Sequence, residues 1–205
     1  MSDEADVRVA IIGSGFGGLG AAIRLKQAGV DDLVLLERAG DVGGTWRDNT
    51  YPGCECDVQS HLYSFSFAPN PEWSRSFSPA PEIQAYLQRV ARDYGIYPHV
   101  RFHHEVLAAA WDDQAQLWRI DTSRGPLTAR VLVMANGALS DPLIPDIPGL
   151  DRFDGRAFHS ARWDHSLDLG GRHVAVIGTG ASAIQLIPAI QPTVGKLYVL
   201  QRTPP

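Results

Sequence analysis

The sequence predicts an α/β fold that contains two strand–helix–strand units. Each unit opens with a β-branched run and a glycine-rich turn, which read RVAIIGSGFGG from Arg8 to Gly18 and HVAVIGTGASA from His173 to Ala183. A strand followed by G-x-G-x-x-G/A and a helix is typical of Rossmann-like dinucleotide-binding units, because the glycines allow a tight turn and a close approach of phosphates. The predicted fold class is therefore α/β with two Rossmann-like βαβ units, the first carrying a β-meander insertion and the second incomplete at the C-terminus.

Periodicity assigns the elements of the first unit. Residues 7–13, 16–28 and 33–37 are predicted as its strand, helix and strand, and Gly29 is expected to end the helix. Residues 41–70 show little periodicity but are dense in Gly, Pro and aromatic residues, which is typical of backbone that lies against a ligand. A helix over 79–94 and meander strands over 106–111, 117–121 and 128–134 complete the unit.

A stiff connector separates this unit from the second one. Three prolines lie between Asp141 and Gly149, where neither a helix nor a central strand can continue. Beyond them, residues 172–178, 183–190 and 196–201 are predicted as strand, helix and strand. One such unit leaves its sheet edge and its apolar faces exposed. This favours a fragment of a longer protein over a domain that borrows its missing strands from a partner.

The residue at the end of the second strand distinguishes the two units. The same spacing separates Gly13 from Glu37 and Gly178 from Arg202. A carboxylate accepts hydrogen bonds from ribose hydroxyls, whereas a guanidinium pairs with a 2′-phosphate. We therefore expect two chemically different dinucleotides, as in a flavoprotein that is supplied with electrons by NADPH.

Composition excludes several other classes. A net charge of −5 without a basic block argues against nucleic acid, and no apolar stretch approaches the roughly 20 residues that span a bilayer. The acidic first residues lack an apolar signal segment, so we expect a cytoplasmic protein, with no protein partner predicted. Cys54 and Cys56 are too close for an easy disulfide and too few for a zinc site, so we interpret them as packing or cofactor-lining residues and expect no metal.

Two longer patterns resemble a known family. GGTWRDNTYPGCECD, residues 43–57, fits A/G-G-x-W-x-x-x-x-F/Y-P-G/M-x-x-x-D, and FDGRAFHSARWD, residues 153–164, fits F-x-G-x-x-x-H-x-x-x-W-D/P. In this order they resemble the flavin-dependent Baeyer–Villiger monooxygenases (class B flavoprotein monooxygenases), in their N-terminal portion. Trp163 favours this branch over the related flavin-containing monooxygenases, which usually carry Phe or Tyr there. Asn136 departs from the family's usual Thr or Ser, and we expect little effect because Asn tolerates unusual backbone angles.

The resemblance implies cofactors, a reaction and site residues. NADPH would reduce FAD, the reduced flavin would trap O2 as a C4a-peroxide, and the peroxide would attack a ketone to give an ester or lactone. The residues implied for FAD are Gly13, Gly15, Phe16, Gly17, Gly18, Glu37, Arg38, Gly44, Thr45, Trp46, Asp57, Tyr63 and Val106. Those implied for NADPH are Cys56, Thr179, Gly180, Ala181, Ser182, Ala183, Arg202 and Thr203. The second fingerprint contributes Phe153, Gly155, His159, Trp163 and Asp164.

Within these sets, Asp57 is the catalytic candidate. By resemblance it lies by the flavin ring and tunes an arginine that family members supply from beyond Thr203, which no position here matches. We expect Asp57 to be partly buried beside a cation, since an unpaired buried carboxylate is costly, and a turn cap is the alternative. His159, in the connector, is expected to couple cofactor occupancy to domain position, with Trp163 packed beside it.

The resemblance also divides the chain and leaves alternatives open. We expect an FAD-binding domain at residues 1–141, a linker with the second fingerprint at 142–171, and the start of an NADPH-binding domain at 172–205. One alternative keeps both cofactors and oxidises sulfide or amine nitrogen instead of a ketone. Another is a truncated, catalytically inactive flavin-binding module, and for residues 1–205 alone we expect no coupled ketone oxidation.

Overall fold

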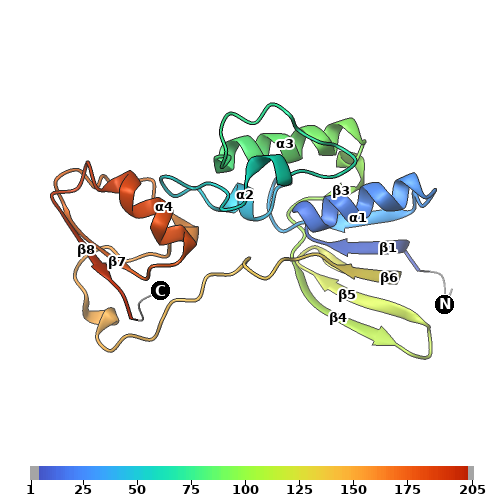
Figure 1. Ribbon diagram of the computed structural model, residues 1–205. Helices are drawn as coiled ribbons and strands as arrows, with labels where there is room; N and C mark the ends of the chain where they lie inside the picture. Colours follow the sequence, from blue (N-terminus) through green and yellow to red (C-terminus); the bar gives the residue numbers. More distant parts are fainter. Residues whose placement is uncertain (1–4, 203–205) are drawn as a thin grey trace. The chain divides into compact units, whose positions relative to one another are not determined.

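A computed structural model describes residues 5–202 and shows a mixed α/β fold (Figure 1). Contacts divide the chain into two units, Met1–Arg47 with Gln84–Ser140 and Asp48–Ile83 with Asp141–Pro205. The expected domain at residues 1–141 therefore includes a segment, Asp48–Ile83, that the structure groups with the second unit. The physical reason is a set of hydrogen bonds between that segment and the helix of the second unit, described below.

The first unit is built on one sheet with the strand order β3-β2-β1-β6-β5-β4. Strand β1 pairs in parallel with both β2 and β6, while β4, β5 and β6 form an antiparallel meander. This arrangement confirms the predicted βαβ unit with a meander. The strands are β1 (Val7–Ile12), β2 (Leu33–Leu36), β3 (Val100–Arg101), β4 (Val106–Asp112), β5 (Leu117–Thr122) and β6 (Gly125–Met134).

Two long helices accompany this sheet, α1 (Phe16–Gln27) and α3 (Ala80–Asp93), as Figure 1 shows. Helix α1 buries Leu19 and Ile23, and α3 buries Leu87, each at no more than 1% exposure, and burial of such a side chain contributes about 1.5–3 kcal/mol. Phe16 and Tyr86 stack with ring centroids 6.1 Å apart, which joins the two helices. Apolar residues at helical spacing therefore explain why both helices form where they were predicted.

The second unit contains β7 (His173–Ile177), α4 (Ala181–Ile190) and β8 (Lys196–Leu200), and its two strands pair in parallel. Helix α4 buries Ala183, Leu186 and Ile190. Much of the strand surface stays exposed among the described residues, as expected for a single strand–helix–strand unit. This unit confirms the second predicted Rossmann-like motif.

The remaining elements are short, and the sequence did not predict them. They are helix α2 (Thr45–Asp48) and the 3₁₀ turns η1 (Ser60–Leu62), η2 (Tyr97–His99), η3 (Leu150–Arg152) and η4 (Ser160–Arg162). Strand β3 also belongs to this group. In the part of the chain from residue 5 to residue 202, no helix has the length and hydropathy of a membrane span.

Candidate functional site

The turn between β1 and α1 forms the first nucleotide cradle, which we define as residues 13–18. Gly13 has φ 93°, and its N–H donates to the Leu36 carbonyl at 2.9 Å. A Cβ at Gly13 would lie 2.7 Å from the Ala135 carbonyl oxygen, and one at Gly18 would collide with the carbonyl oxygen of Gly13. Packing within the protein therefore requires glycine at both positions.

Gly15 has a different reason to be glycine. It is the N-cap of α1 with φ −76°, which any residue adopts, and no side chain caps the helix there. A Cβ at Gly15 would meet its nearest neighbour, the Gly44 α carbon, at an ordinary 3.7 Å. A side chain at this position would instead fill the space over the helix N-terminus, where backbone N–H groups and the helix dipole favour a phosphate. The cradle thus fits the pyrophosphate of a dinucleotide.

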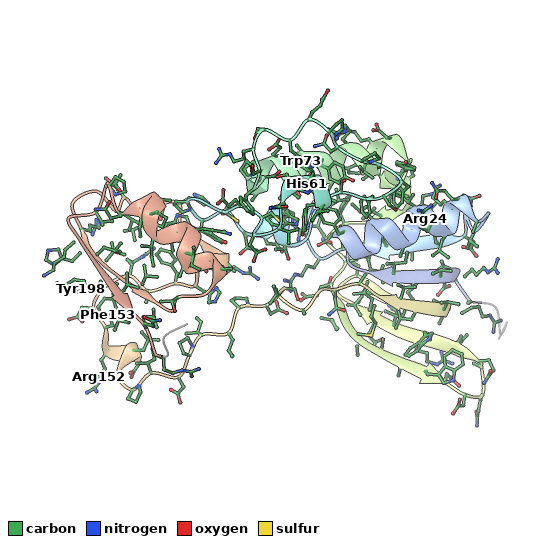
Figure 2. The ribbon with its side chains drawn as sticks, in the orientation of Figure 1. Arg24, His61, Trp73, Arg152, Phe153 and Tyr198 are labelled. Carbon is green, nitrogen blue, oxygen red and sulfur yellow. The ribbon has the colours of Figure 1, made fainter. Side chains whose placement is uncertain are left out.

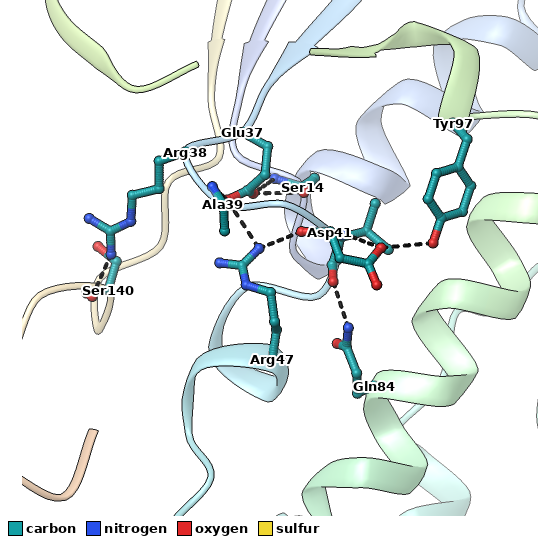
Figure 3. A network of polar contacts seen from close by, with 10 residues as sticks. Ser14, Glu37, Arg38, Ala39, Asp41, Arg47, Gln84, Tyr97 and Ser140 are labelled. Carbon is teal, nitrogen blue, oxygen red and sulfur yellow. Dashed lines mark hydrogen bonds and ion pairs between the residues drawn. The ribbon is translucent and has the colours of Figure 1, made fainter. Parts of the chain in front are cut away.

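Glu37 lies just past the end of β2 and is only 4% exposed (Figure 3). Its Oε2 accepts hydrogen bonds from the Ser14 N–H (3.1 Å) and hydroxyl (2.7 Å). Its Oε1 accepts from the Ala39 N–H (2.9 Å) and pairs with Arg47 Nη1 at 3.0 Å. These donors offset the desolvation of a buried carboxylate and hold the Glu37 side chain fixed beside the cradle.

A polar network extends from Glu37 to the loop after β2 (Figure 3). Arg47 Nη1 also donates to the Asp41 carbonyl (2.6 Å), and Asp41 Oδ1 accepts from the Tyr97 hydroxyl (2.9 Å). Burial, together with the Asp41 carboxylate, raises the pKa of Tyr97 to about 12, so the phenol remains a donor. The network fixes the loop that borders the predicted ribose site.

Two side chains of this site, Ser14 and Arg47, were missed by the sequence analysis. Ser14 lies inside the glycine motif, and Arg47 occupies an unspecified position of the first fingerprint. Both residues therefore lie inside motifs that the sequence analysis identified. Their contact with Glu37, however, depends on the tertiary structure. Arg38, which was predicted, donates from Nη2 to the Ser140 carbonyl at 2.8 Å (Figure 3).

The other residues predicted for FAD fall into both units. Phe16, Gly17, Gly44, Thr45, Trp46 and Val106 belong to the first unit, and Asp57 and Tyr63 belong to the second. Asp57 is exposed, so the partial burial that we expected is absent and the desolvation argument for a neighbouring cation does not apply. The turn after it starts at the N-cap residue Gln59, and the role of Asp57 stays a prediction.

The turn between β7 and α4 forms the second cradle, residues 178–183, which repeats the first. The Gly178 N–H donates to the Leu200 carbonyl at 2.9 Å, and Gly180 is an N-cap without a side-chain cap. A Cβ at Gly180 would meet nothing within 4 Å, so this helix N-terminus has room for a second pyrophosphate. Thr179, Ala181 and Ser182 complete the turn. Arg202 is exposed, and Thr203 lies outside the described residues.

The second fingerprint makes mainly local contacts. A Cβ at Gly155 would lie 2.5 Å from the ring of Phe153, which is 61% exposed (Figure 2). His159 caps η4, since its Nδ1 accepts from the Ala161 N–H at 3.1 Å. The coupling role expected for His159 stays a prediction.

Two further contacts complete this fingerprint. The Trp163 ring packs edge-on against Phe158 at 5.2 Å. Asp164 accepts hydrogen bonds from the Ser166 hydroxyl and from Arg156 Nη2, which lower the pKa of its carboxyl to about 2. The fingerprint thus forms an ordered turn that ends in an ionised acid. Among residues 5–202, no group of His, Cys, Asp and Glu side chains has the arrangement of a metal site.

Comparison with known proteins identifies the class to which this fold and these cradles belong. The family described as pyridine nucleotide-disulphide oxidoreductase matches residues 10–191, so the chain belongs to that family. Within it, the chain is 66% identical over 198 residues to a Baeyer–Villiger monooxygenase of Streptomyces coelicolor, covering 97% of this chain and 38% of the relative. A Baeyer–Villiger monooxygenase of Pseudomonas aeruginosa is 53% identical over 199 residues, with the same coverage of 97% and 38%.

Solved structures agree with these relatives. The crystal structure of OTEMO in complex with FAD and NADP has a TM-score of 0.91 at 38% identity, covering 98% of this chain and 40% of that one. Cyclohexanone monooxygenase from Rhodococcus sp. Phi1 bound to NADP+ has a TM-score of 0.88 at 38% identity, covering 97% and 38%. The resemblance to the N-terminal portion of Baeyer–Villiger monooxygenases is confirmed, and the chain spans about two fifths of the length of these relatives.

Proposed function

We propose that the protein containing this chain is an FAD- and NADPH-dependent Baeyer–Villiger monooxygenase. It inserts one oxygen atom of O2 next to a ketone carbonyl and releases an ester or lactone. The observation that carries this proposal is the pair of matching cradles. The strand after the first cradle is followed by the acid Glu37, and the strand after the second is followed by the base Arg202. The high identity to relatives named as Baeyer–Villiger monooxygenases supports the choice of reaction.

The first cradle fits FAD by the tests that the chain itself offers. Gly15 leaves the α1 N-terminus open to a pyrophosphate, and the Glu37 carboxylate is held beside it to accept hydrogen bonds from ribose hydroxyls. When bound, FAD supplies the chemistry that activates O2. The chain's own residues bind and orient the cofactor, and the Glu37 network holds the ribose acceptor in place.

The second cradle fits NADPH. Gly180 leaves the N-terminus of α4 open. The Arg202 guanidinium is exposed, so it can pair with a dianionic phosphate without first being desolvated. A guanidinium pairs with the 2′-phosphate that distinguishes NADPH from NADH. We assign this cradle to the hydride donor. Ketone specificity, the lack of a protein partner and a cytoplasmic location stay predictions.

The proposal is tested on the longest reading frame that encodes this chain. The purified protein should carry a flavin absorbance spectrum, consume NADPH in response to ketones, and place one ¹⁸O atom from ¹⁸O₂ in the ester or lactone product. Arg202→Glu serves as the control, since it should weaken NADPH use while the bound flavin stays. A protein without flavin contradicts the proposal, and oxidation of sulfides or amines with ketones untouched supports the alternative acceptor.

A further inference from the structure

The side chain of Gln185, in the middle of α4, joins this helix to the segment of residues 51–57. Its Oε1 accepts hydrogen bonds from the Tyr51 hydroxyl at 2.8 Å and the Glu55 N–H at 3.2 Å. Its Nε2 donates to the Glu55 carbonyl at 2.9 Å. One amide therefore satisfies both backbone polar groups of Glu55 and a buried phenol. Such a two-ended contact fixes the position of residue 55 along the helix.

The backbone of the same segment packs directly on α4. Gly53 has φ 79°, and a Cβ there would lie 2.5 Å from the Gln185 carbonyl oxygen and 3.0 Å from the Ala189 Cβ. On its other side, the segment is held by hydrogen bonds from the Cys56 N–H to the Ser78 carbonyl and from the Ala80 N–H to the Cys54 carbonyl, both 2.9 Å. Gln185 is thus the polar part of a close packing contact, and all of these residues belong to the second unit.

This contact reaches the second cradle. Ser182 lies in the first turn of α4, where the dinucleotide phosphates are proposed to bind. Gln185 lies one helical turn further along the same helix. The Tyr51 phenol interacts with the Ser182 hydroxyl as well as with Gln185. Burial is the main reason that the pKa of Tyr51 rises to about 12, so the phenol remains a donor at neutral pH. The far end of the segment carries Asp57, two residues after Glu55.

We propose that Gln185 is a positioning residue that holds the Asp57 segment in register with the second cradle. Occupancy of the cradle by a nicotinamide dinucleotide and closure of residues 51–57 on α4 then stabilise each other. This inference rests on the proposed function, since it takes the second cradle as the dinucleotide site. Thermodynamic linkage makes the effect reciprocal, because a dinucleotide that favours the closed segment must bind more tightly when the segment is closed.

The two cysteines of the chain provide a built-in reporter. Cys54 and Cys56 are both buried in this segment, and burial raises the pKa of both thiols, so they react slowly while it is closed. Labelling with Ellman's reagent, or with a maleimide followed by mass spectrometry of the peptide that contains both thiols, measures opening of the segment. Because mass spectrometry measures labelling on this peptide alone, other thiols of the full-length protein do not contribute to the signal.

The decisive variant is Gln185→Met, which keeps the length of the side chain and removes all its hydrogen bonds. In the flavin-loaded protein it should speed labelling of Cys54 and Cys56 by about tenfold. Saturating NADP+ should slow labelling about fivefold or more in the unaltered protein and by less than about twofold in Gln185→Met. The matched control Gln191→Met, at the exposed C-cap of the same helix, should behave like the unaltered protein.

A second variant keeps the test valid if Gln185→Met does not fold. Tyr51→Phe removes one of the hydrogen bonds and should give an intermediate increase in labelling, about threefold. Turnover adds an independent measurement. Both variants should raise KM for NADPH and waste more NADPH as hydrogen peroxide, with a smaller effect on kcat.

The outcomes separate this inference from the proposed function. Equal slowing by NADP+ in Gln185→Met and in the unaltered protein makes the contact merely structural and overturns the inference. Binding of NADP+ to the unaltered protein without any slowing of its labelling overturns it as well. If either result is found in a protein that oxidises ketones, the proposed function still stands. If NADP+ slows labelling as expected but the protein oxidises only sulfides, the inference stands and the choice of a ketone as acceptor is overturned.

Discussion

The two cradles share one backbone geometry and differ in what stands beside it. The N–H groups of Gly13 and Gly178 each donate at 2.9 Å to the strand that follows the helix, at Leu36 and Leu200. The first backbone bonds of α1 and α4, to Gly15 and Gly180, are both 3.0 Å. Yet Glu37 is buried in a polar network, whereas Arg202 is exposed.

Under the proposed function, this difference corresponds to two physical ways to recognise a ribose. Hydroxyls are weak partners, so an acid that selects them must be held still and kept from water, and it then needs Ser14, Ala39 and Arg47 to compensate for burial. A phosphate carries two negative charges and attracts a guanidinium that remains hydrated and needs no such support. The predictions below test this contrast, from the largest expected effect to the smallest.

Removal of the buried acid should have the largest effect on stability. Glu37→Leu leaves the Ser14 and Ala39 donors and the Arg47 guanidinium without their acceptor, so the free energy of unfolding should fall by about 3 kcal/mol. Urea unfolding followed by circular dichroism measures the loss. The exposed Glu72→Leu is the control and should change it by no more than about 0.5 kcal/mol. Equal losses in both variants would remove the basis of the contrast.

Reversal of the exposed base should change nucleotide choice and leave stability unchanged. Arg202→Glu should lower the preference for NADPH over NADH by about 10–100-fold, because a charge-assisted contact with the 2′-phosphate is replaced by repulsion. Steady-state kcat/KM values for the two nucleotides give the ratio. Arg152→Glu makes the same charge change at an exposed site outside the cradle and should keep the preference.

The third glycine position sharpens the comparison at the level of packing. Gly18→Ala should lower the free energy of unfolding by about 2 kcal/mol, since the new Cβ collides with the Gly13 carbonyl oxygen. The second cradle already carries Ala183 at this position, and Ala183→Gly should cost only about 1 kcal/mol through helix propensity. Thermal unfolding of both variants measures the two losses. If Gly18→Ala does not lower stability, the first turn is less tightly packed than its geometry indicates.

The last effect appears only at alkaline pH and concerns one tyrosine in each unit. Burial is the largest cause that raises the pKa of Tyr97 from 10.0 to about 12, so the folded state keeps a proton that the unfolded state loses in this range. Stability should therefore fall as pH rises from about 10 to about 12, and Tyr97→Phe should flatten this fall. Tyr51→Phe should act in the same way in the second unit. Urea midpoints across this pH range measure both slopes, and unchanged slopes would contradict the assignment.

Long periodic elements were predictable, while short ones were not. The helices α1 and α3 and the strands of both βαβ units follow the predicted ranges within about two residues, because their apolar spacing is set by the face that they bury. Strand β3 has two residues and α2 has four, too few for a period to be seen. Their formation depends on neighbours that come from elsewhere in the chain.

The site divides in the same way. Glu37 and the cradle glycines follow from local spacing, whereas the contacts of Arg47 with Glu37 and of Gln185 with Glu55 depend on tertiary structure. The second of these joins residues 130 positions apart, and no local pattern encodes such a contact. For the same reason the sequence does not show that residues 48–83 group by contact with the second unit, and the expected domain boundaries stay a prediction.

The chain passes between the two units at three places, Arg47 to Asp48, Ile83 to Gln84 and Ser140 to Asp141. An engineer who wished to exchange the second unit between relatives would therefore need three splice junctions. A single cut at residue 141 would separate residues 51–57 from α4. It would also expose Gly53, which packs directly against that helix. In this architecture a module is defined by contact and not by continuity of the chain.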